Sequence, residues 1–257
     1  MLCCAGHTGA AHMLPNILKQ GGGVGGRLCT VMRETICTIP VNEVFEQTGG
    51  CPICRMRNTI EEKYVDYITG AAMMEPDIRE MTNKTGFCER HYFQMLAKTG
   101  QRLPVCLTLT THLADIEKRL LRSADSGAIK GLTALEQSCF VCEMIERNLS
   151  RALDTVYRTY RDEEEFRSLF ASQEHICLPH YKRMIEEGKK TLGKQYKGFC
   201  AEANRLTAGY CQSLINDLKA FADSFDHRNA GIPMPEASRD SLERSVDFVT
   251  SRNNKNR

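Results

Sequence analysis

The chain has 257 residues, of which 42% are hydrophobic and 26% are charged, so a globular body with its own core is expected. Its 34 basic and 32 acidic residues give a net charge of +2, which excludes the strongly basic footprint of a nucleic-acid-binding protein. No stretch approaches the roughly 20 apolar residues that span a bilayer, and the N-terminus lacks the early basic residues of a secretory signal. The sequence therefore predicts a cytoplasmic protein whose 13 cysteines are metal ligands and free thiols.

Residues 1–31 differ in character from the rest of the chain. The run from Gly21 to Gly26 disfavours a helix or strand, because glycine loses the most backbone entropy on folding. It is not a phosphate loop either, since no Gly-Lys-Ser/Thr follows it. We expect a disordered leader or a misplaced start codon, with Met32 as the natural first residue.

A first unit is predicted over residues 32–122. Thr48-Gly49-Gly50 frees the backbone for a turn, and Cys51-Pro-Ile-Cys54 follows directly. Pro76 stops or restarts the next helix, and Cys88-Glu-Arg-His91 opens another. The helical apolar stripe between them comprises Met56, Ile60, Tyr64, Ile68 and Met73.

The first unit ends in a predicted amphipathic helix from Leu103 to Leu121. A linker with two glycines, 123–131, separates it from the second unit. The side chains expected on one side of this helix are Leu103, Leu107, His112, Leu113, Ile116 and Leu120.

A second unit, 132–227, repeats the plan. Cys139 lies 88 residues after Cys51, and Cys177 lies 89 residues after Cys88. A long helix is predicted from Lys189 to about His227, and a flexible tail over 228–257, with a short helix at 242–249 as the alternative. The fold class is all-α, with two tandem helical zinc-binding repeats followed by a long C-terminal helix.

Each unit contains two thiols and then a thiol and an imidazole, which are the four ligands of a closed tetrahedral zinc site. We therefore predict two Zn²⁺ per chain, each held within one unit. The first ion is assigned to Cys51, Cys54, Cys88 and His91, and the second to Cys139, Cys142, Cys177 and His180.

Other interpretations of these cysteines remain open. They could be buried free thiols, a dithiol redox motif, or ligands of an iron–sulfur cluster, although such clusters usually take four cysteines. Cys106, Cys200 and Cys211 are expected to be core or half-buried thiols on helices. His112 and His175 are expected to be packing or surface residues. The stretch from Gly70 to Arg79 could form a ligand pocket, or a helix corner in which Arg79 pairs with a carboxylate.

Several of these segments together resemble a known family. The segments are Thr35 to Phe45, Cys51 to Cys54, Gly70 to Arg79, Asn83 to Cys88, and His91. They are similar to a family of bacterial proteins, found largely in Firmicutes and catalogued as domain of unknown function 6062. The resemblance covers roughly Met32 to Phe225 and implies a cytosolic bacterial protein of unassigned role.

Three functions compete at this point. The first is a non-catalytic zinc-stabilised module that binds a protein or peptide partner. The second is a regulator whose sites lose metal on oxidation. The third is a zinc enzyme, which would need an open coordination position that two complete sets do not leave. Neither a nucleic acid nor a membrane is expected as a partner.

Overall fold

The computed structural model describes residues 41–229 and 231–251, and the predicted leader at 1–31 lies outside them. Within these ranges the chain forms helices and connecting loops and no strand, so the predicted all-α class is confirmed. No helix in the described part is both long and apolar enough to cross a bilayer. The 3-10 turns are η1 (Ala71–Met74), η2 (Gly193–Gln195) and η3 (His227–Asn229). The helices are α2 (Val41–Glu46), α3 (Pro52–Thr69), α4 (Pro76–Thr85), α5 (Glu89–Ala97), α6 (Arg102–Leu120), α7 (Ser126–Glu136), α8 (Phe140–Asp162), α9 (Glu164–Ala171), α10 (Leu178–Leu192), α11 (Tyr196–Asp223), α12 (Glu236–Arg239) and α13 (Ser241–Thr250).

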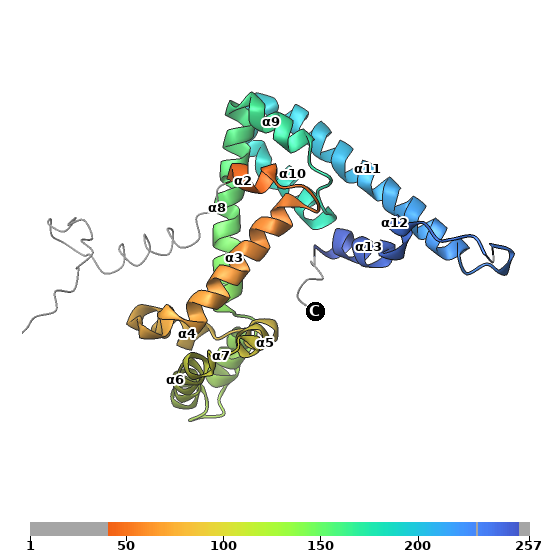
Figure 1. Cartoon of the computed structure of the whole chain (residues 1–257). Coiled ribbons are helices and arrows are strands. Elements are labelled where there is room, and N and C mark those ends of the chain that lie inside the picture. Colours follow the sequence, from red (N-terminus) through yellow and green to blue (C-terminus); the bar gives the residue numbers. More distant parts are fainter. Residues whose placement is uncertain (1–40, 230, 252–257) are drawn as a thin grey trace, which may run out of the picture.

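The α3–α8 pair is the centre of the molecule, and the two helices run in opposite directions (Figure 1). Tyr64 near the end of α3 meets Phe140 at the start of α8, with ring centroids 6.4 Å apart. Asn148 donates a hydrogen bond to the Tyr64 hydroxyl at 3.0 Å. The predicted stripe on α3 is confirmed for Met56, Ile60, Tyr64 and Ile68, which are all buried. Burying such a stripe is what holds an amphipathic helix in place.

The two predicted units share one core. Phe45 on α2 contacts Phe166 and Phe170 on α9, with ring centroids 4.9 and 6.0 Å apart. The Arg55 guanidinium on α3 donates to the side chain of Gln173, just beyond α9. Helices α8, α9 and α10 begin 88, 88 and 89 residues after α3, α4 and α5, which is the spacing that a repeat predicts.

The corner between α3 and α4 is held differently from the expectation. Pro76 occupies the first turn of α4, as predicted. At this corner the Tyr67 hydroxyl donates a hydrogen bond to Glu75 at 2.7 Å, and the described residues show no ion pair of Arg79 with a carboxylate. In the second unit Arg167 donates to the carbonyl of Tyr160 at 3.1 Å, near the end of α8, where a cation stabilises the last turn of a helix.

The predicted linker is partly a helix. Asp125 accepts a hydrogen bond from the Ala128 amide at 2.8 Å and so caps α7, which begins at Ser126. A Cβ at Gly131 would lie 2.4 Å from Leu120 Cδ2, so this glycine lets α6 and α7 approach closely. Gly131 therefore allows two helices to pack closely and does not serve as a flexible linker residue.

The apolar face predicted for α6 is confirmed for His112 and Leu120, which are buried, and is wrong for Leu103, Leu107 and Leu113, which are exposed. The residues that face inward are Val105, Thr108, His112 and Leu120. Leu103 and Leu113 are 63% and 59% exposed. A helix with leucines on two faces does not reveal from its sequence which face a neighbour covers.

The C-terminal part also differs from the expectation. The predicted helix from 189 divides at Gly193, whose φ of +52° interrupts α10, and α11 begins at Tyr196. The predicted tail folds as far as Ser251, because Phe248 on α13 is buried beside Tyr210 and His175. The alternative helix at 242–249 corresponds to α13. In Figure 1, α12 and α13 lie along α11.

Candidate metal centres

The structure gathers all eight predicted ligand residues into two clusters, each with its ligand atoms within 4.8 Å of one another. Site I comprises Cys51 and Cys54 at the start of α3 and Cys177 and His180 at the start of α10. His180 Nδ1 lies 3.1 Å from Cys177 Sγ and 3.4 Å from Cys54 Sγ, and those two sulfurs are 3.6 Å apart. A tetrahedral zinc ion with ~2.3 Å bonds would separate its sulfur ligands by roughly 3.8 Å. The spacing at site I therefore fits such an ion.

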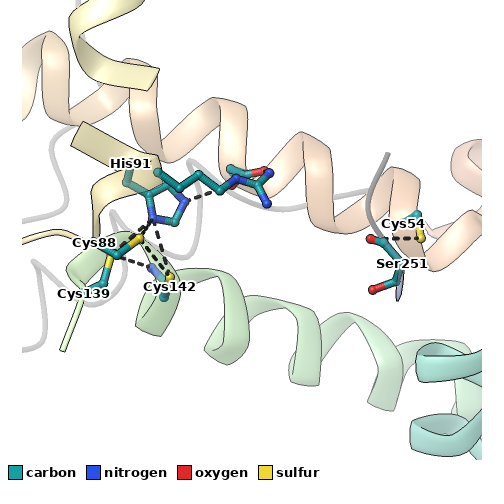
Figure 2. Close-up of polar contacts among 8 residues, drawn as sticks. Cys54, Cys88, His91, Cys139, Cys142 and Ser251 are labelled. Carbon is teal, nitrogen blue, oxygen red and sulfur yellow. Dashed lines mark hydrogen bonds and ion pairs between the residues drawn. The ribbon is translucent and has the colours of Figure 1, made fainter. Parts of the chain in front are cut away.

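Site II comprises Cys88 and His91 of the α5 start and Cys139 and Cys142 of the α8 start. His91 Nδ1 lies 3.1, 3.2 and 3.5 Å from the sulfurs of Cys88, Cys139 and Cys142. Figure 2 shows the His91 ring pointing toward these sulfurs, while Cys54 lies at a distant point of α3 with Ser251 beside it. The two sites therefore sit at different points along the α3–α8 pair.

The predicted pairing of the ligands is wrong. Each Cys-x-x-Cys pair meets the Cys-x-x-His pair of the other unit, not that of its own unit. Helix lengths explain this exchange. The 18 residues of α3 run for ~27 Å, whereas the 10 residues of α4 span only ~15 Å. Likewise α8 has 23 residues and α9 has 8, or about 34 Å against 12 Å. Each Cys-x-x-His pair therefore stays far from the Cys-x-x-Cys turn of its own unit and lies beside the start of the long helix of the other unit.

Each site lies where two helices begin. Cys51, Cys88, Cys139 and Cys177 are the N-cap residues of α3, α5, α8 and α10. The Cys142 amide donates to Cys139 Sγ at 3.5 Å. Helix N-termini favour negative charge, so two of them at one site stabilise thiolates.

The thiols of each site also influence one another. Hydrogen bonds, first from Cys142, hold the pKa of Cys139 at about 3. The hydrogen bond with Cys139 keeps the proton on Cys142 and so raises the pKa of Cys142, and burial and the negative charge of Cys139 act in the same direction. At site I burial opposes ionisation of Cys51, but hydrogen bonds from Cys177, Cys54 and His180 keep its pKa well below the usual range. One thiolate per site forms readily, and a divalent cation would allow the others to ionise.

Glu61 of α3 distinguishes site II from site I. Its carboxylate is buried, 2.9 Å from His91 Nε2 and 2.8 Å from an Arg90 nitrogen. Burial disfavours the imidazolium, but hydrogen bonds to Cys139 and Glu61 outweigh it and raise the pKa of His91 to about 9. A carboxylate on the second ring nitrogen fixes the orientation of a ligating histidine. The position 88 residues later is Leu149, which offers no such acceptor.

Sequence inspection missed Glu61, although a signal was present. It lies between Ile60 and Tyr64 on a helix that is otherwise apolar on that side. An acidic residue in such a stripe is buried only when it has partners. The partners themselves, on α5, could not be identified from the local pattern.

A pocket of about 480 Å³ opens beside site I. Its walls include Cys54, the Gly49–Gly50 turn, His175, Tyr210 and Arg244. His175 is buried and stacks on Tyr210 with ring centroids 3.8 Å apart, so its predicted packing role is confirmed. The end of α13 covers one side, where the Cys54 thiol lies 4.0 Å from the Ser251 carbonyl.

The sulfurs of the two sites differ in their access to solvent. Cys51 and Cys177 of site I are buried and Cys54 is half-buried, whereas Cys142 of site II is exposed. Outside the sites, Cys200 and Cys211 are half-buried as expected. Cys106 is exposed, contrary to expectation, because it lies on the outer face of α6.

The fold and these clusters define an all-helical protein with two Cys₃His centres that could each hold a metal ion. A family model described as "Family of unknown function (DUF6062)" matches residues 32–256, and the chain belongs to that family. Comparisons with curated proteins and with solved structures found no match. The bacterial source and cytoplasmic location inferred from the sequence stay predictions.

Proposed function

We propose that the protein is a non-catalytic, zinc-stabilised helical protein that binds a protein or peptide partner. The observation that supports its structural role most directly is the exchange of ligands between the units. Each set is complete at four and takes two residues from each of the two units. An ion at either site would therefore join segments 123 or more residues apart at site I and 48 or more apart at site II.

Zinc is the metal that this donor set favours. Three thiolates and one imidazole at tetrahedral spacing are typical of structural zinc sites. Both sets leave no open position for a substrate or water, which supports a structural rather than a catalytic ion. Closing such long loops is entropically costly, so a metal bound only by the folded state would stabilise it substantially.

The exposed surface supports a binding role. Phe93 and Leu96 on α5 and Leu103 and Leu113 on α6 are all exposed. Large apolar side chains that stay exposed on neighbouring helices are a feature of interaction sites. The α5–α6 region is therefore where we propose that a partner binds.

Metal analysis of protein purified without added metal tests the structural role. We expect two Zn²⁺ per chain, and we expect Cys88→Ser or Cys177→Ser to lower both the zinc content and the melting temperature sharply. Structural zinc contributes about 10–16 kcal/mol in small peptides, which rivals the roughly 5–15 kcal/mol stability of a domain. Cys106→Ser, an exposed cysteine outside both sites, is the matched control and should change neither quantity.

A chelator gives the complementary measurement. Removal of the metal should reduce helical circular dichroism in parallel with zinc loss. If the chelated protein keeps its spectrum and melting point, the structural role is wrong. A zinc enzyme using the pocket beside site I would then be the better proposal, since loss of a catalytic ion leaves the fold intact.

A redox-responsive regulator is the second candidate, and the exposure of Cys142 favours it. Its sulfur lies 3.9 Å from that of Cys88, close enough to form a disulfide after a small movement. Hydrogen peroxide would oxidise the two thiolates to a disulfide, itself being reduced to two waters on uptake of two protons, and would free the ion. We expect dilute peroxide to release zinc from site II before site I. Equal release from both sites, or none, would argue against this role.

A further inference from the structure

The outer face of α6 has an unusual composition for a helix surface. No Asp, Glu, Lys or Arg occurs from Leu103 to Ala114. The exposed residues in this stretch are Leu103, Cys106, Leu107, Thr110, Leu113 and Ala114. Helix surfaces that face water normally carry charged residues opposite the buried stripe. This face, the α6 outer face, is therefore built for contact with another apolar surface.

Within the described part of the chain the neighbours of α6 lie on its other side. Val105 and His112 face inward, and His112 Nδ1 donates to the Asn83 carbonyl on α4 at 2.9 Å. Leu120 lies against Gly131 of α7. With Leu103 and Leu113 more than half exposed, the chain itself leaves the α6 outer face uncovered over residues 41–229 and 231–251.

Exposed charged residues border this face at both ends, a basic one before it and one of each sign, Glu117 and Lys118, after it. Arg102 precedes it and Glu117 follows it, and both are exposed. At 3.6 residues per turn, Arg102 and Glu117 project about 60° apart around the helix. Lys118 projects about 160° away from Arg102, on the other side of the face.

We propose that a second copy of this chain covers the α6 outer face, with the two α6 helices antiparallel and a twofold axis near Thr110. Leu107 of one copy then packs against Leu113 of the other. The same symmetry brings Arg102 of one copy beside Glu117 of the second copy, while Lys118 lies on the opposite side. A parallel arrangement would instead place Arg102 against Arg102 and Glu117 against Glu117.

An uncharged face favours a copy of itself as its occupant. A twofold interface brings each patch against the same patch of the second copy. A charged residue at its centre would therefore face a residue of the same charge. The α6 outer face avoids that repulsion over its whole centre and has complementary charges only at its ends. This inference rests on the binding role proposed above and identifies its partner as the chain itself.

Sedimentation velocity of the full-length, zinc-loaded chain over a concentration series tests the proposal. We expect the wild type to form a dimer. The double variant Leu103→Asp/Leu113→Asp should raise the dimer dissociation constant at least about tenfold, because it buries four carboxylates in the interface. Ile215→Asp is the control, because Ile215 is an exposed residue of similar size that lies on α11, outside the α6 outer face. It should leave the dimer unchanged.

Charge reversal tests the antiparallel geometry. Arg102→Glu should weaken the dimer about two- to tenfold, as expected for two exposed ion pairs turned into repulsions. Adding Glu117→Arg should restore it, because the pairs re-form with their signs exchanged. If the double reversal stays as weak as the single one, the antiparallel arrangement is wrong.

Zinc measured in the same samples separates this proposal from the proposed function. A wild type that stays monomeric at every concentration overturns the self-association, whether or not the α6 outer face later proves to bind a different protein. Two zinc ions in such a monomer would leave the structural role of the metal standing. A dimer that contains no zinc would support the self-association and overturn the structural role of the metal.

Discussion

At the scale of single residues, Glu61 is the side chain that should make the two metal sites unequal. It contacts His91 Nε2 and Arg90 at once, and its counterpart 88 residues later is Leu149. Loss of a carboxylate behind a ligating histidine typically weakens metal binding about 10–100-fold. We expect Glu61→Gln to weaken zinc binding at site II by that order and to leave site I unchanged. Competition with a chromophoric chelator would resolve the two binding steps.

The neighbouring residue provides the control for this substitution. Glu62 is exposed on the outer side of α3, so Glu62→Gln changes the same charge without touching His91. If both variants release zinc at the same chelator concentration as the wild type, Glu61 has no influence on the metal.

At the scale of elements, Gly131 and Gly209 offer a matched comparison. Both lie within helices, where Gly→Ala normally stabilises by roughly 0.5–1 kcal/mol. A Cβ at Gly209 would meet nothing within 4 Å, whereas one at Gly131 would collide with Leu120 across the α6–α7 contact. We expect Gly209→Ala to raise the free energy of unfolding by that amount and Gly131→Ala to give no gain or a loss. Denaturant titration measures both, and equal gains would show that α6 and α7 do not pack as closely as the structure has them.

Elements were predicted well where the signal is local. The stripe on α3, Pro76 at the start of α4 and the cysteines at helix starts follow from propensity and spacing within a few residues. The inward face of α6 was predictable only in part, because its leucines lie on two sides and the helices packed against it, chiefly α4 and α7, decide between them. Likewise, α13 carries a single deeply buried aromatic residue, Phe248, and its docking depends on Tyr210 and His175 far along the chain.

At the scale of the whole molecule, the identity of the ligands and their grouping depend on different information. Residue type and spacing were sufficient to select all eight residues of the two clusters, since a Cys-x-x-Cys turn and a Cys-x-x-His helix start are local patterns. The grouping depends on the lengths of α4 and α9 relative to those of α3 and α8. That is a property of helix lengths in three dimensions, and within either unit alone the wrong pairing looks complete.

Metal stoichiometry of paired variants tests the exchanged grouping over the whole molecule. Cys54→Ser/Cys177→Ser removes two ligands from site I alone, so about one zinc ion should remain per chain. Cys54→Ser/Cys88→Ser removes one ligand from each site, so neither site keeps its full set and the zinc content should fall below one. Grouping within each unit predicts the reverse order, because Cys54 and Cys88 would then share a site. Cys106→Ser/Cys211→Ser, two cysteines outside both clusters, should retain two ions. Since the two test variants lose the same number of thiols, only the arrangement of the ligands in space can make their zinc contents differ.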